Sequence, residues 1–337
     1  MWDHFRRKDI AKWIKEGDTY AEQGKYNEAL RSYDKALDID PREPETFFKK
    51  GLIFKEQGKY TEAIEFFDKA LEVDQKNAQI WYQKGISLGN LGKIEDALKC
   101  FDRILEIDPK YAVVAWYHKG LTLGKLGRYE EAIQSYDVVL EMDPKYAIAW
   151  YSRGIILEYM GRYQEASDCF DKALDMYRKS ADLWYHKGHT LCKLGKRDEA
   201  FKAFDTAIQI DPLHQNAYVS KGMILEEDGK YDDAIALYDR VLKIDPLNAK
   251  AWYQKGLSLQ KIGKYEEAIA CFNKALDIVP ENVIVLLSKG VVLASLGEYR
   301  MSLACFDKAL GIQDIPEVRN IREAVASELK AQGASPT

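Results

Sequence analysis

A motif of 34 residues recurs nine times along this chain of 337 residues, and it limits the possible folds more than any other feature. The clearest copy runs from Ala249 to Asn282, with Trp252 at place four, Gly256 at place eight and Gly263 at place fifteen. Counted in the same way, repeats begin near residues 10, 44, 78, 113, 147, 181, 215, 249 and 283. Such a period is typical of a solenoid, in which each repeat packs only against its neighbours.

Glycine and aromatic residues keep this register along the chain. Of the 22 glycines, 18 fall at place eight or place fifteen, and every repeat has Phe or Tyr at place twenty-four. Places 4, 8 and 11 follow helical spacing, and so do places 20, 24 and 27. Each repeat is therefore predicted to contain a helix A and a helix B. The glycine at place fifteen ends helix A, where a left-handed residue is favoured.

These residues resemble the tetratricopeptide repeat family, whose pattern places a large aromatic residue, Leu-Gly, Tyr, Ala, Phe, Ala and Pro over 34 residues. The resemblance covers roughly residues 10–314. It implies an all-α fold, an alpha-alpha superhelix built as a right-handed solenoid of nine tandem helix-turn-helix repeats. It also implies a fold that serves to bind ligands and that occurs in proteins of unrelated pathways.

The two ends of the array depart from the repeat. Residues 1–9, with Trp2 and Phe5, are expected to form an N-terminal extension over the open end of repeat one. Residues 315–332 are expected to form a C-terminal capping helix, because terminal repeats need a polar outer face, and residues 333–337 a loose tail. The apolar stripe of that helix consists of Val318, Ile321, Val325 and Leu329.

Two of the connections between repeats are also irregular. The glycine spacing of 35 between Gly85 and Gly120 predicts one disturbed loop or helix start. Repeat five has Arg178 where proline is usual, so Met176–Ser180 is expected to form a longer turn or a helix extension.

Charge and hydropathy exclude several classes of function. The net charge is −5 and the pI is near 5.7, which argues against a nucleic-acid or anionic-membrane binder. The first residues hold no apolar signal segment, and no window approaches the ~18 apolar residues that a membrane span needs. Four of the five cysteines share place twenty-three, about one helix diameter (~10 Å) apart and too far for a disulfide. We expect a cytoplasmic protein with these thiols as small buried filler.

The sequence contains no arrangement of residues that is typical of catalysis. A glycine-rich phosphate loop, a nucleophile elbow, zinc-ligand spacing and a Ser-His-Asp set are all missing, so we expect no enzyme, no cofactor and no metal. His186, His189 and Cys192 follow one another at three-residue steps on a helix A. Each step turns about 60° away from the last, so one metal would not easily reach all three. The alternative is that the two histidines are polar residues lining the groove and that Cys192 is a small filler side chain.

A candidate binding surface follows from places five and nine of helix A. In the resembled family these places face the concave side of the superhelix, where ligands bind. Place five here is aromatic in six repeats and place nine is mostly aliphatic, a ladder suited to an extended peptide or a helix. The residues expected to contact the ligand are Tyr82, Tyr117, Tyr151, Tyr185 and Tyr253, with Gln83, His118 and His189 setting polarity. Alternatively, the tyrosines only pack against the next helix A.

The expected function is a non-enzymatic scaffold that binds a peptide segment or helix of a partner protein in the concave groove. The partner would carry apolar or aromatic side chains. A self-assembling array, a homo-oligomer formed through the C-terminal end and a regulatory subunit of a separate enzyme are the alternatives. The carboxylate clamp of some relatives is not expected, because the corresponding places hold Ile14, Asp18, Lys49, Gln79 and Gln83.

Overall fold

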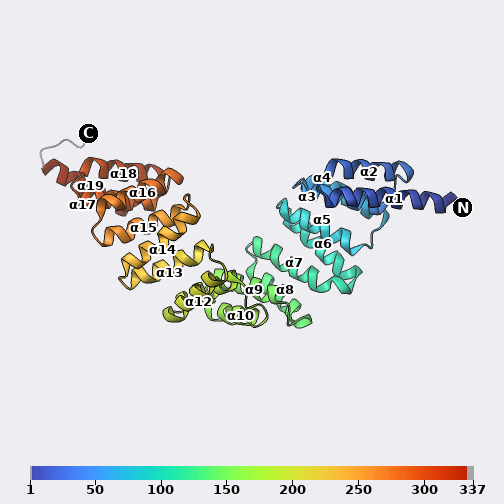
Figure 1. Cartoon of the computed structure of the whole chain (residues 1–337), viewed down its shortest axis with the longest axis horizontal. Helices are drawn as coiled ribbons and strands as arrows, with labels where there is room; N and C mark the ends of the chain where they lie inside the picture. Colours follow the sequence, from blue (N-terminus) through green and yellow to red (C-terminus); the bar gives the residue numbers. More distant parts are fainter. Residues whose placement is uncertain (1, 332–337) are drawn as a thin grey trace. The chain divides into compact units, whose positions relative to one another are not determined.

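The computed structural model describes the backbone of residues 2–331 and the side chains of residues 6–331. The expected tail, residues 333–337, lies outside this range, as do the side chains of Trp2 and Phe5. The described part contains 19 α-helices, one short 3-10 helix and no strand. Consecutive helices pair as helix A and helix B (Figure 1). The predicted all-α fold of helix pairs is confirmed.

Contacts divide the chain into two compact units, unit 1 at Met1–Met176 and unit 2 at Tyr177–Thr337. The division falls between repeats five and six. Odd-numbered helices up to α17 are A helices, and even-numbered helices are B helices. Unit 1 contains α1 (Trp2–Glu22), α2 (Tyr26–Ile39), α3 (Pro44–Glu56), α4 (Tyr60–Val73), α5 (Ala78–Asn90), α6 (Ile94–Ile107), η1 (Pro109–Tyr111), α7 (Ala112–Lys125), α8 (Tyr129–Met142), α9 (Ala147–Tyr159) and α10 (Tyr163–Met176).

Unit 2 repeats the same pattern of helix pairs and ends on a single helix, α19. Its helices are α11 (Ala181–Lys193), α12 (Arg197–Ile210), α13 (Gln215–Glu227), α14 (Tyr231–Ile244), α15 (Ala249–Lys261), α16 (Tyr265–Ile278), α17 (Val283–Ser295), α18 (Tyr299–Ile312) and α19 (Pro316–Ala331).

The two irregular connections differ in outcome. The extra residue between repeats three and four lies where η1 forms, and α7 follows directly after it. The connection after α10 takes four residues, as many as the one between α8 and α9. The longer turn or helix extension expected at Met176–Ser180 is therefore not formed.

The glycine at place fifteen makes every turn between helix A and helix B. All nine have positive φ, between 71° and 79°, a conformation in which a β-carbon is strained. At Gly263 the amide of Lys264 donates to the carbonyl of Leu259 at 2.9 Å, while the Gly263 amide donates to Gln260 at 3.1 Å. This pair of bonds is a Schellman motif, which satisfies the last carbonyls of helix A.

The glycine at place eight makes room for the aromatic ring at place twenty-four. A β-carbon on Gly51 would lie 2.5 Å from Cε1 of Phe67, and one on Gly256 would lie 2.5 Å from Cε1 of Phe272. Both rings are fully buried. Helix A and helix B of one repeat thus approach closely enough for a ring to pack directly on a backbone.

Ion pairs join helix B of one repeat to helix A of the next at six junctions in the described part of the chain. The carboxylate comes from the aspartate at place twenty-five and the cation from place seven of the following repeat. Because the pairs are partly exposed, each contributes at most about 1 kcal/mol, but together they fix the register of the stack. The pairs are Lys50–Asp34, Lys84–Asp68, Lys119–Asp102 and Arg153–Asp137 in unit 1, and Lys221–Asp205 and Lys255–Asp239 in unit 2.

Helix α19 takes the position of a further helix A. Arg322 pairs with Asp307 at 2.6 Å, which continues the row of ion pairs. The next residue is Glu323, where the repeats have glycine. No helix B follows α19 within the described residues, so there is no place-twenty-four ring that would require a glycine at this position. At the other end, residues before repeat one belong to α1, and Nη2 of Arg6 donates to the carbonyl of Ile39 at 2.6 Å.

Candidate functional site

Neighbouring A helices contact one another within each unit. In unit 1 the contacts run from α1 through α3, α5 and α7 to α9, and in unit 2 from α11 through α13 and α15 to α17. We call the residues at places two, five, nine and twelve of these helices the A-helix face. The eight residues expected to bind a partner lie at place five, or at places six and nine beside it.

Four of the five place-five tyrosines pack on the place-twenty-four ring of their own repeat. Ring centroids lie 6.0 Å apart for Tyr117–Tyr136, 6.2 Å for Tyr151–Phe170, 6.0 Å for Tyr185–Phe204 and 6.0 Å for Tyr253–Phe272. Such tilted ring pairs stabilise each repeat beyond the area that they bury.

Three of these tyrosines also reach the next helix A through their hydroxyl groups. The Tyr82 hydroxyl lies 2.9 Å from Nε2 of His118. The hydroxyl of Tyr117 lies 3.3 Å from Oγ of Ser152, and that of Tyr253 lies 3.3 Å from Oγ of Ser288. Place five thus bonds to place six of the following repeat, a partnership that the sequence analysis missed.

Burial separates Tyr117 from the other four tyrosines. Tyr117 is only 7% exposed, and the ring of Tyr146 lies edge-on against it, with the centroids 5.5 Å apart. Tyr82, Tyr151, Tyr185 and Tyr253 are half-buried. The packing role, which the sequence left as the alternative, is therefore present. Ligand contact stays a prediction, and the half-buried rings are the ones with exposed surface for it.

The polar candidates tie neighbouring A helices together in unit 1. His118 is packed edge-on against Tyr82 at 5.0 Å and Tyr117 at 5.2 Å. Burial lowers the pKa of His118 to about 4. The ring is therefore neutral at pH 7, and its Nε2 can accept a hydrogen bond from the Tyr82 hydroxyl. Oε1 of Gln83 accepts a hydrogen bond from Nζ of Lys55 at 3.0 Å.

The candidates in repeat six gather around one tyrosine. The Tyr185 ring lies 6.4 Å from His189 and 5.1 Å from His186, centroid to centroid. The described residues contain no group of three His, Cys, Asp or Glu side chains that could hold a metal ion. His186, His189 and Cys192 therefore form no such cluster.

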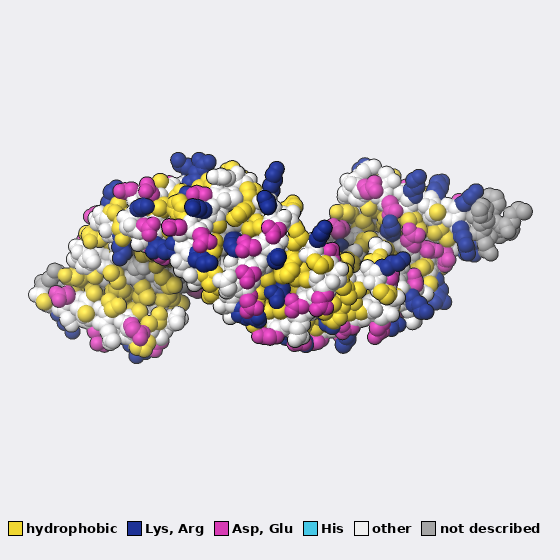
Figure 2. Space-filling model, turned by 90° about the horizontal axis from the view of Figure 1, so that it is seen from below, with side chains coloured by type: hydrophobic (Ala, Val, Ile, Leu, Met, Phe, Trp, Pro, Cys, Tyr) yellow, Lys and Arg dark blue, Asp and Glu magenta, His cyan; other side chains and the backbone are white. Residues whose placement is uncertain are grey.

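Aliphatic side chains at places two and nine are the most accessible apolar part of the A-helix face. In unit 1, Ile148 is 49% exposed, and place nine holds half-buried aliphatic residues from Leu52 to Ile155. In unit 2, Ile284 is 62%, Val291 39% and Met223 37% exposed. Figure 2 shows hydrophobic side chains gathered over the C-terminal repeats, at the left of the view. Packing between repeats does not cover these residues.

Acidic groups on the same face are tied to neighbours inside the protein. Asp18 accepts from the Tyr33 hydroxyl at 2.7 Å and pairs with Lys49 at 2.9 Å. Glu226 accepts from the Ser258 hydroxyl, and burial raises the pKa of this carboxyl group. These carboxylates are therefore already partnered without any ligand.

The four cysteines at place twenty-three are buried thiols. Cys100, Cys169, Cys271 and Cys305 are buried and unbonded to one another. Burial raises the pKa of Cys100 to about 12 and that of Cys271 to about 11. A thiol with so high a pKa is a poor nucleophile at neutral pH.

No helix among residues 2–331 combines the length and the apolar composition that crossing a membrane requires. On the face shown in Figure 2, Lys and Arg side chains are interspersed with Asp and Glu.

Comparison with known structures finds the same fold. A tetratricopeptide repeat protein from Parabacteroides merdae is 21% identical, with a TM-score of 0.58 over 75% of this chain and 99% of that one. The type IV pilus biogenesis factor PilW is 22% identical, with a TM-score of 0.57 over 62% of this chain and 97% of that one. A chain in the structure of the APC/C hetero-tetramer Cut9–Hcn1 is 14% identical, with a TM-score of 0.58 over 94% of this chain and 76% of that one. A comparison with the curated proteins finds no relative.

Family models match the chain from residue 17 to residue 282. A model of the TPR repeat matches residues 17–58 and 51–92. Models of the tetratricopeptide repeat match residues 78–111, 111–179, 151–212, 185–249 and 249–282. These segments follow one another without a gap and reach from α1 to the turn after α16. The chain belongs to the tetratricopeptide repeat family.

Proposed function

We propose that this protein is a non-enzymatic scaffold whose A-helix face binds a peptide segment or a helix of a partner protein. The observation that carries the proposal is the set of aliphatic side chains at places two and nine that repeat packing leaves exposed. Ile148 in unit 1 and Met223, Ile284 and Val291 in unit 2 are its most exposed members. Exposed apolar surface of this kind is typical of protein interaction sites.

The spacing of the A helices suits an extended partner. Stacked helices lie about 10 Å apart, and an extended chain advances ~3.3 Å per residue. Such a partner would therefore advance about three residues from one A helix to the next. The half-buried rings of Tyr82, Tyr151, Tyr185 and Tyr253 lie beside this row and offer flat apolar contact with a hydroxyl at one end.

The same fold occurs in an assembly of proteins, the APC/C hetero-tetramer Cut9–Hcn1. That likeness supports a scaffold role for a repeat stack of this kind and says nothing of which partner this chain binds. Self-association through α19 receives less support, because Val318, Val325 and Leu329 are buried inside unit 2. Only Ile321 of that stripe is exposed.

Photo-crosslinking tests which face of the helices carries the binding. Benzoylphenylalanine would replace Met223 or Val291 on the A-helix face and, as matched controls, the exposed Ala236 on α14 or Ala270 on α16. Irradiation in native lysate should yield a discrete adduct from Met223 and Val291 only. Adducts of equal yield from the two B-helix positions would contradict the proposal, as would no adduct from either A-helix position.

A further inference from the structure

Repeat six departs from the others at place seventeen, the first position of helix B. Seven repeats have tyrosine there, repeat three has Ile94, and repeat six has Arg197. The seven tyrosines are half-buried, and they are Tyr26, Tyr60, Tyr129, Tyr163, Tyr231, Tyr265 and Tyr299.

The usual tyrosine packs at the junction between one repeat and the next. Tyr26 packs against the cluster that contains Ile53, and Tyr265 packs against the cluster that contains Val292. Ile53 and Val292 both lie at place ten of the following helix A. In these two repeats an aromatic ring therefore packs on the apolar cluster to which the place-ten residue belongs.

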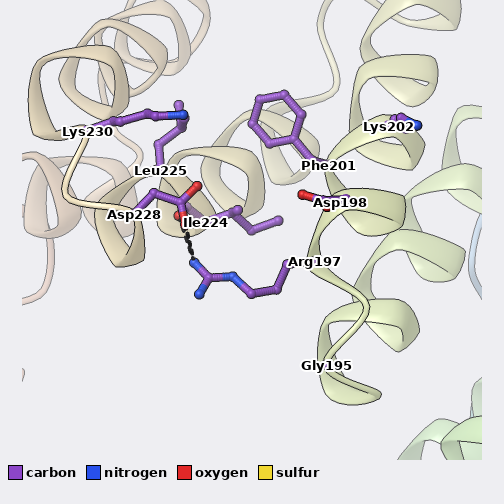
Figure 3. Close-up of a pocket in the computed structure, with 9 residues that line it drawn as sticks. All are labelled: Gly195, Arg197, Asp198, Phe201, Lys202, Ile224, Leu225, Asp228 and Lys230. Atoms are coloured by element: carbon purple, nitrogen blue, oxygen red, sulfur yellow. Dashed lines mark hydrogen bonds and ion pairs between the residues drawn. The ribbon is translucent and has the colours of Figure 1, made fainter.

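Arg197 does not replace that ring. Its Nη2 donates to Oδ1 of Asp228 at 2.8 Å and to the carbonyl of Ile224 at 3.2 Å, and it pairs with Glu227 at 3.1 Å. Figure 3 shows the arginine directed toward Asp228, with an open space above it between Phe201 on α12 and Leu225 on α13. The Nε–H of Arg197 is buried and has no acceptor among the described residues.

The space is a pocket of about 610 Å³, within the size range of small-ligand sites. Phe201, Ile224 and Leu225 form its apolar walls. Its charged lining consists of three cations, Arg197, Lys202 and Lys230, and two carboxylates, Asp198 and Asp228. Arg197 is paired with Asp228 and Glu227, which leaves Lys202 and Lys230 as the lining cations without an ion pair among the described residues.

We propose that this pocket binds an aromatic side chain of a partner protein, from a segment with acidic residues beside the aromatic one. The ring would take the place that tyrosine fills in seven other repeats and stack against Phe201. Lys202 and Lys230 would face the acidic neighbours of the ring, and Arg197 would meet its π-face. This site is separate from the A-helix face and does not depend on the function proposed above.

Methyl NMR on the full chain tests the site with two short peptides, acetyl-Glu-Tyr-Glu-amide and acetyl-Glu-Leu-Glu-amide. The tyrosine peptide should cause saturable shifts in the methyl signals of Ile224 and Leu225. The leucine peptide should bind at least about tenfold more weakly, because it has no ring to stack. Absence of saturable shifts with the tyrosine peptide would overturn the proposal, and so would equal affinity for both peptides.

The variant Arg197→Tyr restores the usual residue and should abolish the shifts by filling the pocket from within. Its melting temperature should equal or exceed that of the wild type, so that lost binding does not reflect unfolding. Lys230→Gln should weaken binding several-fold, whereas Lys264→Gln, at the same place in repeat eight, should leave it unchanged. Full binding by Arg197→Tyr, or equal effects of the two lysine variants, would contradict the assignment.

Discussion

Replacement of Gly85 by alanine should destabilise unit 1, whereas the same replacement at Gly89 in the same helix should stabilise it. A β-carbon on Gly85 would lie 2.9 Å from Cε1 of Phe101 and 3.2 Å from Cβ of Cys100, and both residues are buried. A β-carbon on Gly89 would have no neighbour within 4 Å. Overpacking costs about 1–3 kcal/mol, and alanine in a helix gains about 1 kcal/mol over glycine.

We therefore expect a net loss of up to about 2 kcal/mol for Gly85→Ala and a gain of up to about 1 kcal/mol for Gly89→Ala. Urea unfolding followed by circular dichroism measures both. Changes of the same sign in the two variants would show that helix propensity, and not the close contact of helix A with the place-twenty-four ring, decides the effect at place eight.

Acidification should destabilise unit 1 through His118. Burial, and to a smaller degree the charge of Lys125, lowers the pKa of this ring from 6.5 to about 4. A depressed pKa means that the unfolded chain takes up the proton first, so the stability is present above pH 6.5 and is lost as the pH falls toward 4. The full effect is up to about 3 kcal/mol, since one pKa unit corresponds to about 1.4 kcal/mol.

The variant His118→Gln isolates this contribution. Glutamine keeps an acceptor for the Tyr82 hydroxyl, 2.9 Å from His118 in the wild type, but cannot be protonated in this range. Melting temperatures of both proteins between pH 7 and pH 4 should diverge, with the wild type falling more steeply. Parallel curves would show that His118 is not held neutral by its surroundings.

The helix pairs were predictable because the signal lies inside one repeat. Helix A must end before helix B begins, and this predicts the positive φ of Gly263. The 34-residue period also predicts that α15 starts at Ala249, as it does. The burial of Phe272 was predictable because Gly256 has no side chain and leaves room for the ring. Each of these contacts joins residues less than one repeat apart, so spacing alone reveals them.

Contacts between repeats were harder to predict from the sequence. The carboxylate register of Asp34 and its equivalents was visible, but its pairing with Lys50 depends on how one repeat sits on the next. Tyr117 and Tyr82 share place five, yet only Tyr117 is buried, and spacing within one repeat does not reveal the ring of Tyr146 that packs against it. In contrast, the departure at Arg197 was readable as a break in a column of tyrosines, and only the structure shows the space that it leaves.

The role proposed for the A-helix face depends on surface that the fold itself does not use. The most direct test compares the affinity of the crosslinked partner for two double variants, one on each face of the helices. Met223→Asp with Val291→Asp places charges on the A-helix face, and Ala236→Asp with Ala270→Asp places them on exposed B-helix positions. Calorimetry should show at least about tenfold weaker binding for the first pair, because an apolar contact is exchanged for a buried charge, and less than about twofold change for the second. Equal affinities of the two double variants would contradict binding through the A-helix face.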